Sequence, residues 1–377
     1  MRNNYSWKKF ILLVPIALLG ILALLVPQMT AGNPQIAENY LLHIYPTISA
    51  PLVFMTSLIP ISLTEVFVVF VVLTILLWVI LFFYRFSRSK EREKLLYRFL
   101  LIVVCMFTLN SFSYTLFLGL GYTREPLLNT LKLTTENRSV EELYEVTDWL
   151  LQKTSETREQ VNEDENGCMS LSTDLSTSFR YANTAIDRAA VTFPLMKGNT
   201  VVPKPVFISH LWSYTGITGM YFPFFGEANI NIDVPELFLP YTVCHEVAHV
   251  RGIAREEDAN LVSFLACLAS DRADFQYSGY QYALVYCLDD LYFADPELYS
   301  EIYQGIPEGT IRDWDANNAY WVQFEGPIEE TSESINDSFL KANQQDSGVR
   351  SYSEVTDLII SYYFQYVKGA ENAQGNS

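Results

Sequence analysis

Three long apolar runs dominate the first third of the chain. Residues 10–26, 66–84 and 99–120 contain no charged side chain. Each run approaches the roughly 20 residues that a helix needs to cross a bilayer. We therefore expect three transmembrane helices. The loop of residues 28–65, between the first two, is also largely apolar and predicts an interfacial helix or cap on the outer membrane surface.

Positively charged residues indicate the orientation of these helices. Arg2, Lys8 and Lys9 precede the first run, and six further Lys or Arg lie between residues 85 and 98. Such clusters stay in the cytoplasm. The N-terminus is therefore predicted to be cytoplasmic, and the chain after residue 120 is predicted to lie on the outer side of the membrane. The alternative for the first run is a cleaved signal peptide, because a basic start and an apolar segment fit that too.

The remainder of the chain mixes helical and strand patterns. Ser139 and Glu142 predict a capping box at the start of a helix that runs to about residue 162. Alternation between residues 201 and 232 predicts a small sheet. Helical patterns cover the residues 170–192, 241–252, 256–271, 279–293, 334–344 and 353–367. We expect an α+β, mainly α fold: a membrane domain (1–120), one outer domain (121–368) and a disordered tail (369–377).

The net charge changes sign after residue 120, at the predicted boundary between the membrane domain and the outer domain. Residues 1–120 carry 9 Lys or Arg and 4 Asp or Glu, a net charge of +5, whereas residues 121–377 carry 16 and 39, a net charge of −23. An acidic domain argues against nucleic acid as a partner, because that binding rests on basic side chains. The lipid bilayer is the partner that the apolar runs predict. The five cysteines form no CxxC pair, and disulfide pairing stays open.

The pentapeptide from His245 to His249 carries the strongest chemical signal. Two histidines four residues apart share one face of a helix, which places two nitrogen ligands beside one metal ion. Glu246 lies between them in this HExxH motif. The flanking residues are apolar, so the helix is expected to be buried, where two histidines and a glutamate need partners or a metal. We predict a Zn²⁺ site.

A third ligand is expected shortly after this helix. Gly252 allows the chain to reverse, and a second helix can begin near residue 255. Glu256, Ala259 and Asn260 share a face there and resemble the signature by which glutamate-type zincins supply a third ligand. That resemblance implies that Glu256 binds zinc and that Asn260 orients a ligand histidine. The gap after His249 is short for that class, so Glu257 and Asp258 remain alternatives.

This site predicts a hydrolase. Three protein ligands leave one zinc position for water, whose pKa falls towards about 7. Glu246 is then the general base and acid for peptide hydrolysis. Glu227 and Asn229, on a strand-like stretch ending at Ile232, are candidates for a substrate-binding edge strand. The residue that stabilises the oxyanion is open, with Tyr241, His210 and Tyr352 as candidates.

Several segments together resemble a bacterial family of multi-pass membrane proteins, a domain of unknown function with a zincin-like HExxH motif. They are IYPTIS, IPISLTE, GMYFPFFGEANIN, CHEVAHVRGIAREEDANLVSFLAC, FQYSGYQYAL and DSGVRSYSEVTDLI. The resemblance covers about residues 38–365 and implies a membrane-anchored zinc metallopeptidase of the glutamate-ligand (gluzincin) type. Asp258 departs from the glutamate expected in many relatives.

Two functions follow from these observations. The first is a membrane-anchored zinc endopeptidase that cleaves proteins or peptides outside the cytoplasm. The alternative is a non-catalytic membrane sensor or scaffold in which the zinc is structural. The sequence leaves open the substrate, the physiological role and the oligomeric state.

Overall fold

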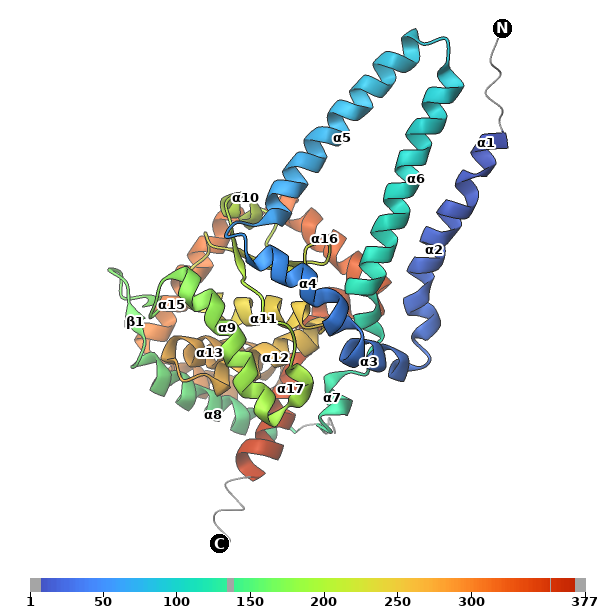
Figure 1. The fold of residues 1–377 in the computed structure, drawn as a ribbon. Coiled ribbons are helices and arrows are strands. Elements are labelled where there is room, and N and C mark those ends of the chain that lie inside the picture. The colour runs from blue at the N-terminus through green and yellow to red at the C-terminus, as the bar shows by residue number, and fades with distance from the viewer. Residues whose placement is uncertain (1–7, 134–138, 353, 370–377) are drawn as a thin grey trace.

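The computed structural model describes residues 8–133, 139–352 and 354–369. Among these described residues, three helices are long and apolar enough to cross a membrane: α2 (Leu13–Thr30), α5 (Leu63–Arg88) and α6 (Arg92–Phe117). In Figure 1, α5 and α6 project far beyond a helical body, and α2 lies along α6. The three predicted membrane helices are present, with ends that differ from the predicted ones by a few residues.

The first membrane helix continues through Pro27, beyond its predicted end. Proline lacks the N–H that would bond to the carbonyl four residues earlier, at Ala23. In the structure Thr115 of α6 donates its hydroxyl hydrogen to that carbonyl at 2.8 Å. The helices also approach closely, since a Cβ on Gly20 would lie 3.0 Å from Cα of Thr108. Small and hydroxyl residues therefore join α2 to α6.

The connection between the first two membrane helices packs against the body. It forms α3 (Pro34–His43) and α4 (Tyr45–Ser57). Tyr45 is buried and donates its hydroxyl hydrogen to Val250 O at 2.8 Å, and Val53 belongs to the main hydrophobic core. The segment predicted as a cap on the membrane surface is thus an integral layer of the body, and packing is continuous across residue 120.

The sheet of the body is small and mixed. Its strands are β3 (Lys204–Val206), β4 (Gly219–Phe222) and β5 (Glu227–Asn231), in the order β3-β5-β4. Strand β5 is parallel to β3 and antiparallel to β4. A separate hairpin joins β1 (Asn162–Glu163) to β2 (Met169–Ser170). The strand predicted as an edge is therefore the central one, and all five of its residues are buried.

Two buried helices form the centre of the body. They are α11 (Leu239–Val250) and α12 (Glu256–Ala269), which pack on each other, and α11 also contacts β4 and β5. Around them lie the helices α7 (Leu127–Thr130), α8 (Val140–Arg158), α9 (Leu175–Thr192), α10 (Ser209–Ser213), α13 (Ala273–Ala294), α14 (Pro296–Gln304), α15 (Glu308–Trp321), α16 (Pro327–Ala342) and α17 (Val355–Tyr362).

Several helices differ from the predicted ones. The capping box of Ser139 and Glu142 is confirmed at the start of α8. Helix α13 begins six residues earlier than predicted, and α14 and α15 lie where no helix is predicted. Asp295 caps α14 by accepting hydrogen bonds from two backbone N–H groups, with Pro296 at its first position. All five cysteines are free. Of the predicted disordered tail of residues 369–377, Gly369 is helical, and residues 370–377 lie outside the described residues.

A buried polar cluster fastens α5 to the central strand. The Glu227 carboxylate accepts hydrogen bonds from the N–H groups of Leu63 and Thr64 and from the Thr64 hydroxyl. It thereby occupies the positive end of the helix dipole. Asn229 accepts a hydrogen bond from Ser62 at 2.6 Å. Burial lowers the pKa of nearby Lys204, and the charge of Glu227 opposes that shift. Glu227 and Asn229 are therefore structural residues at this junction.

We expect Glu227→Gln to destabilise the protein. The substitution removes the buried charge that caps α5 and faces Lys204, and breaking a buried ionic arrangement costs about 3 kcal/mol. The unfolding midpoint in detergent should fall by about 5–10 °C. Glu330→Gln, at an exposed position on α16, is the matched control and should leave the midpoint unchanged. Equal midpoints for the two variants would contradict the assignment.

Candidate metal centre

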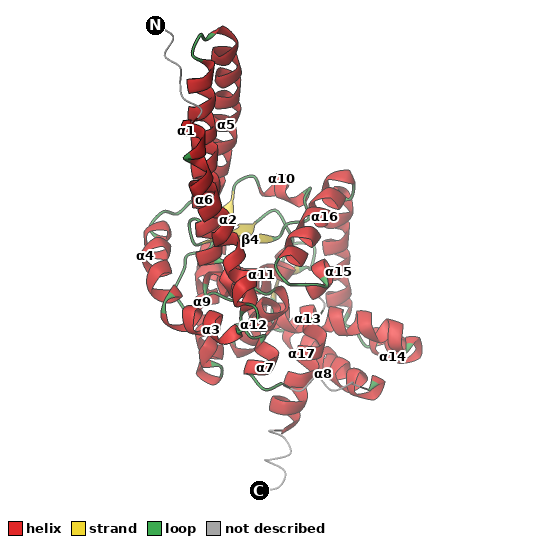
Figure 2. Cartoon of the chain, turned by 90° about the vertical axis from the view of Figure 1, so that its right-hand side faces the viewer, coloured by secondary structure: helices red, strands yellow, loops and turns green. Residues whose placement is uncertain are grey.

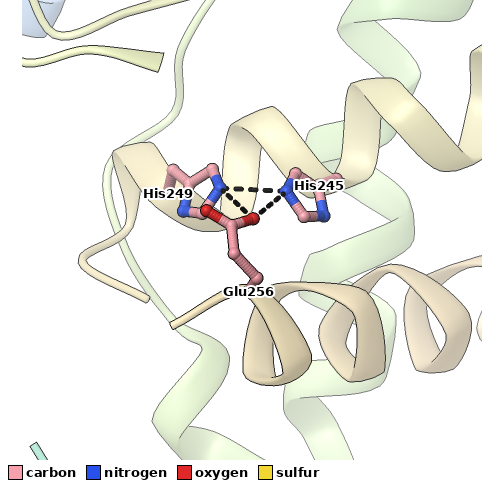
Figure 3. Close-up of side chains that lie close together, drawn as sticks. All are labelled: His245, His249 and Glu256. Atoms are coloured by element: carbon pink, nitrogen blue, oxygen red, sulfur yellow. Dashed lines mark hydrogen bonds and ion pairs between the residues drawn. The ribbon is translucent and has the colours of Figure 1, made fainter. Parts of the chain in front are cut away.

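Helix α11 presents His245 and His249 on the same face, as their spacing predicts. Their Nε2 atoms are 2.9 Å apart. Figure 3 shows both rings turned towards the carboxylate of Glu256, which comes from the start of α12. Glu256 Oε2 lies 3.1 Å from Nε2 of His245 and 3.6 Å from Nε2 of His249. These three groups are close enough together to hold one metal ion.

The turn between the two helices explains how so short a gap brings Glu256 to the histidines. Gly252 has a φ of +92°, in the left-handed region that favours glycine. The N–H of Ile253 bonds to Ala248 O at 3.1 Å, and the N–H of Gly252 bonds to His249 O at 3.0 Å. This pair of bonds is a Schellman motif, which ends α11 and reverses the chain at once. Helix α12 can therefore begin at Glu256.

The outer nitrogens of both imidazoles are held by carbonyl oxygens. His245 Nδ1 lies 2.9 Å from Asn260 Oδ1, and His249 Nδ1 lies 2.7 Å from Ile253 O. A carbonyl oxygen only accepts, so each Nδ1 carries the hydrogen and each Nε2 presents its lone pair. Asn260 thus has the orienting contact that the sequence predicted.

Three electron-pair donors therefore face one another in a buried site. Such an arrangement is repulsive unless a cation or a proton lies between them. Burial alone would lower the pKa of His249, but the Glu256 carboxylate outweighs burial and raises it to about 9. Burial opposes ionisation of Glu256, yet the two histidines hold the pKa of its carboxyl well below the usual range. The residues fit a divalent cation, and two imidazoles with one carboxylate suit zinc.

The two alternative ligands are engaged elsewhere. Glu257 accepts from Arg255 Nε at 2.6 Å and also bonds to Gln345. Asp258 accepts from the N–H of Leu127 at 2.9 Å. The structure thus brings Glu256 to the histidines and turns its two acidic neighbours to other partners.

Glu246 lies beside the cluster on the inner side of α11. Its side chain is buried, and its Oε2 atom has no hydrogen-bond partner among the residues that the structure describes. Burial raises the pKa of this carboxyl. Strand β4 lies directly against it: a Cβ on Gly219 would lie only 2.6 Å from Glu246 Oε1. Nothing in the sequence marks Gly219 as a site residue, and only the packing identifies its role.

A cleft of about 970 Å³ opens over these residues. Its floor is formed by His245, Glu246 and Glu256, and one wall by β4. The opposite wall consists of residues from α15 and α16, such as Trp321 and Phe339, and the end of α6 closes one side. Among the described residues that line this cleft, none is Lys or Arg.

Other predicted residues lie outside the cleft or are already occupied. Glu227 and Asn229 point to the start of α5, so the substrate edge predicted there is wrong, and β4 is the strand that lines the cleft. Tyr241 is buried and donates to Asn260 O at 2.8 Å. His210, on α10, bonds to Asp233 at 2.8 Å. The side chain of Tyr352 lies outside the part of the chain that the structure describes.

The fold and site together define a mainly helical protein with three candidate membrane helices and a buried cluster that could hold a metal. The chain belongs to the family described as "Protein of unknown function (DUF3810)", whose model matches residues 40–360. That match includes α5, α6 and all three residues of the cluster. No curated protein and no solved structure matches the chain.

We expect the purified protein to bind one divalent metal ion per chain, measured by elemental mass spectrometry after dialysis against zinc. Glu256→Gln should lose the metal, because it removes the carboxylate that completes the cluster with both histidines. Asn260→Ala should weaken zinc affinity about 10- to 100-fold, since it frees the ring of His245 to rotate. Glu257→Gln is the control. Metal retained in Glu256→Gln but lost in Glu257→Gln would contradict the ligand set.

Proposed function

We propose that this protein is a membrane-anchored zinc metallopeptidase that hydrolyses peptide bonds of proteins or peptides outside the cytoplasm. The position of Glu246 carries this proposal. A buried carboxylate oxygen with no partner in the described part of the chain lies next to three convergent ligands, at the floor of an open cleft. A structural zinc site is usually closed by four protein ligands, whereas a catalytic site has three and keeps one position open.

The chemistry assigned to the chain's residues is acid–base catalysis. A zinc ion, when bound, supplies a Lewis acid that polarises a carbonyl and makes water more acidic. Glu246 then accepts the proton of the attacking water at its carboxylate and returns it to the departing amine. Burial raises the pKa of Glu246, which makes its carboxylate a stronger base. Asn260 and the carbonyl of Ile253 keep both imidazoles in the tautomer that ligation requires.

Strand β4 is the surface that we assign to the substrate backbone. It pairs with β5 on one side, and its residues line the cleft. An extended peptide can add to such a strand through main-chain hydrogen bonds, which suits a peptidase of broad sequence tolerance. The absence of Lys and Arg among the described lining residues disfavours phosphorylated or nucleic-acid ligands.

The orientation in the membrane is part of the same proposal. Figure 2 shows the body at one end of the membrane helices and the α5–α6 connection at the other. That connection is flanked by basic residues such as Arg85, Arg88 and Arg92. Because such residues favour the cytoplasmic side, the body and its cleft are assigned to the outer side. The same rule assigns the N-terminus to the cytoplasm.

We expect Glu246→Gln to abolish hydrolysis while zinc binding persists. Glutamine keeps the size of the side chain and removes its basic oxygen, and loss of a general base typically costs about 100- to 10,000-fold in rate. Cleavage of a fluorogenic pool of random peptides by the full chain in detergent, with zinc content measured in parallel, provides the test. Equal cleavage by both proteins would favour the sensor or scaffold with a structural zinc.

Gly219→Ala tests the same site by adding one methyl group while leaving every proposed catalytic group in place. The new methyl group would meet Glu246 and displace its carboxylate, and a misplacement of about 1 Å can cost on the order of 100-fold in rate. The backbone at this glycine is outside the left-handed region, so alanine itself introduces no strain there. Gly32→Ala is the control, because no atom lies within 4 Å of its new methyl group. Unchanged activity in Gly219→Ala would contradict the assigned position of Glu246.

A further inference from the structure

The lengths of α5 and α6 fix the level at which they leave the bilayer. Helix α6 carries basic residues up to Arg98, and then no charge from residue 99 to its end at Phe117. This stretch is about 29 Å long at 1.5 Å per residue, which matches the hydrocarbon core. In α5 the uncharged stretch lies between Glu65 and Arg85. Phe117 and Glu65 therefore mark the same membrane surface.

The candidate metal centre adjoins the end of α6. Tyr221 donates its hydroxyl hydrogen to Phe117 O at 3.2 Å, and its ring stacks beside the ring of His249, with centroids 6.4 Å apart. Gly121, just after α6, approaches the turn that follows α11 so closely that a Cβ would lie 2.6 Å from Cβ of Ala254. A single layer of side chains thus separates the metal ligands from the point where the chain leaves the membrane.

Both walls of the cleft are tied to the membrane helices. On the β4 side, the ring of Phe67 in α5 contacts the rings of Phe222 and Phe225, with centroids 6.3 and 5.1 Å away. On the α16 side, the ring of Phe339 contacts Tyr114 in the last turn of α6, with centroids 6.3 Å apart. Phe222, Phe339 and Tyr114 all line the cleft. The cleft therefore reaches the level at which α5 and α6 enter the bilayer.

The body exposes large apolar side chains around this level. Phe207 just before α10, Leu211 within α10 and Leu58 before α5 are 79%, 60% and 69% exposed. On α16, Ile335 is 66% exposed and also lines the cleft. In Figure 2, α10 and α16 lie at the end of the body from which the membrane helices project. Exposed apolar residues in continuity with membrane helices fit contact with lipid.

We propose that the cleft opens at the surface of the bilayer and takes the polypeptide segment that directly follows a membrane anchor. This substrate class rests on the proposed peptidase function. A juxtamembrane segment leaves the lipid at the level of Phe222 and Phe339 and meets β4 without a long linker. Soluble peptides reach the cleft only from the side facing away from the membrane.

Anchored probes test the substrate class. The full chain in lipid nanodiscs is given pools of random fluorogenic hexapeptides that are palmitoylated through a linker of about 2 residues or of about 20, which span at most about 7 and 70 Å. A third pool is acetylated and has no anchor. We expect the short-linker pool to be cleaved at least as fast as the long-linker pool, and the acetylated pool about 10-fold more slowly or less.

Cleavage of the long-linker pool alone would place the site away from the bilayer and overturn the inference. Equal cleavage of the anchored and acetylated pools would also overturn it. If Glu246→Gln cleaves every pool as fast as the unsubstituted protein, the peptidase function itself is refuted. This result differs from those that overturn the substrate class alone.

A second measurement tests the location of the cleft and does not depend on catalytic activity. A fluorophore is attached at Phe339→Cys in a background with Cys105→Ser and Cys168→Ser, and is quenched by lipids that carry a nitroxide near the headgroup. Phe293→Cys, at an 83% exposed position where α13 meets α14, is the control on a part of the body away from α5 and α6 (Figure 2). We expect strong quenching at position 339 and none at 293. Equal quenching at both positions would overturn the inference.

Discussion

Three lone pairs directed at one buried point are the constraint on which the body depends. His245, His249 and Glu256 come from two largely buried helices, and burial makes their mutual repulsion costly unless a proton or a cation lies between them. The left-handed turn at Gly252 fixes the second helix relative to the first, and Ile253 in that turn holds one imidazole. Backbone geometry and ligand orientation are thus set by the same few residues.

Helical spacing explains why the residues of this cluster could be predicted from the sequence. His245, Glu246 and His249 are related by helical spacing alone, and Glu256 and Asn260 by spacing on the next helix, so local periodicity placed them correctly relative to one another. The choice of Glu256 over Glu257 and Asp258 depended on the turn. The structure shows where those two carboxylates go: Glu257 bonds to its neighbour Arg255, and Asp258 bonds to Leu127, which is distant in sequence.

The features that the sequence concealed all depend on long-range packing. The strand from Glu227 to Asn231 alternates polar and apolar residues, yet its three polar side chains are buried. The start of α5 supplies partners for Glu227 and Asn229, and Ser213 of α10 supplies one for Asn231. The side chain of Gly219 offers no functional group that would mark it in the sequence. Its role follows from how closely its backbone packs against Glu246. Helices α14 and α15 both contact α8, far earlier in the chain, and α14 also begins with a local signal, the cap at Asp295.

The hydrogen bonds between Glu227 and the first turn of α5 limit how this protein can be cut into fragments. In many anchored enzymes the membrane segment is a tether that can be exchanged or removed. Here the carboxylate that caps the membrane helix belongs to the central strand of the sheet, and Tyr45, from the connection before α5, holds the end of α11. A fragment that starts after residue 120 would leave both interactions without partners. Anchor and body therefore form one inseparable architectural unit rather than two modules.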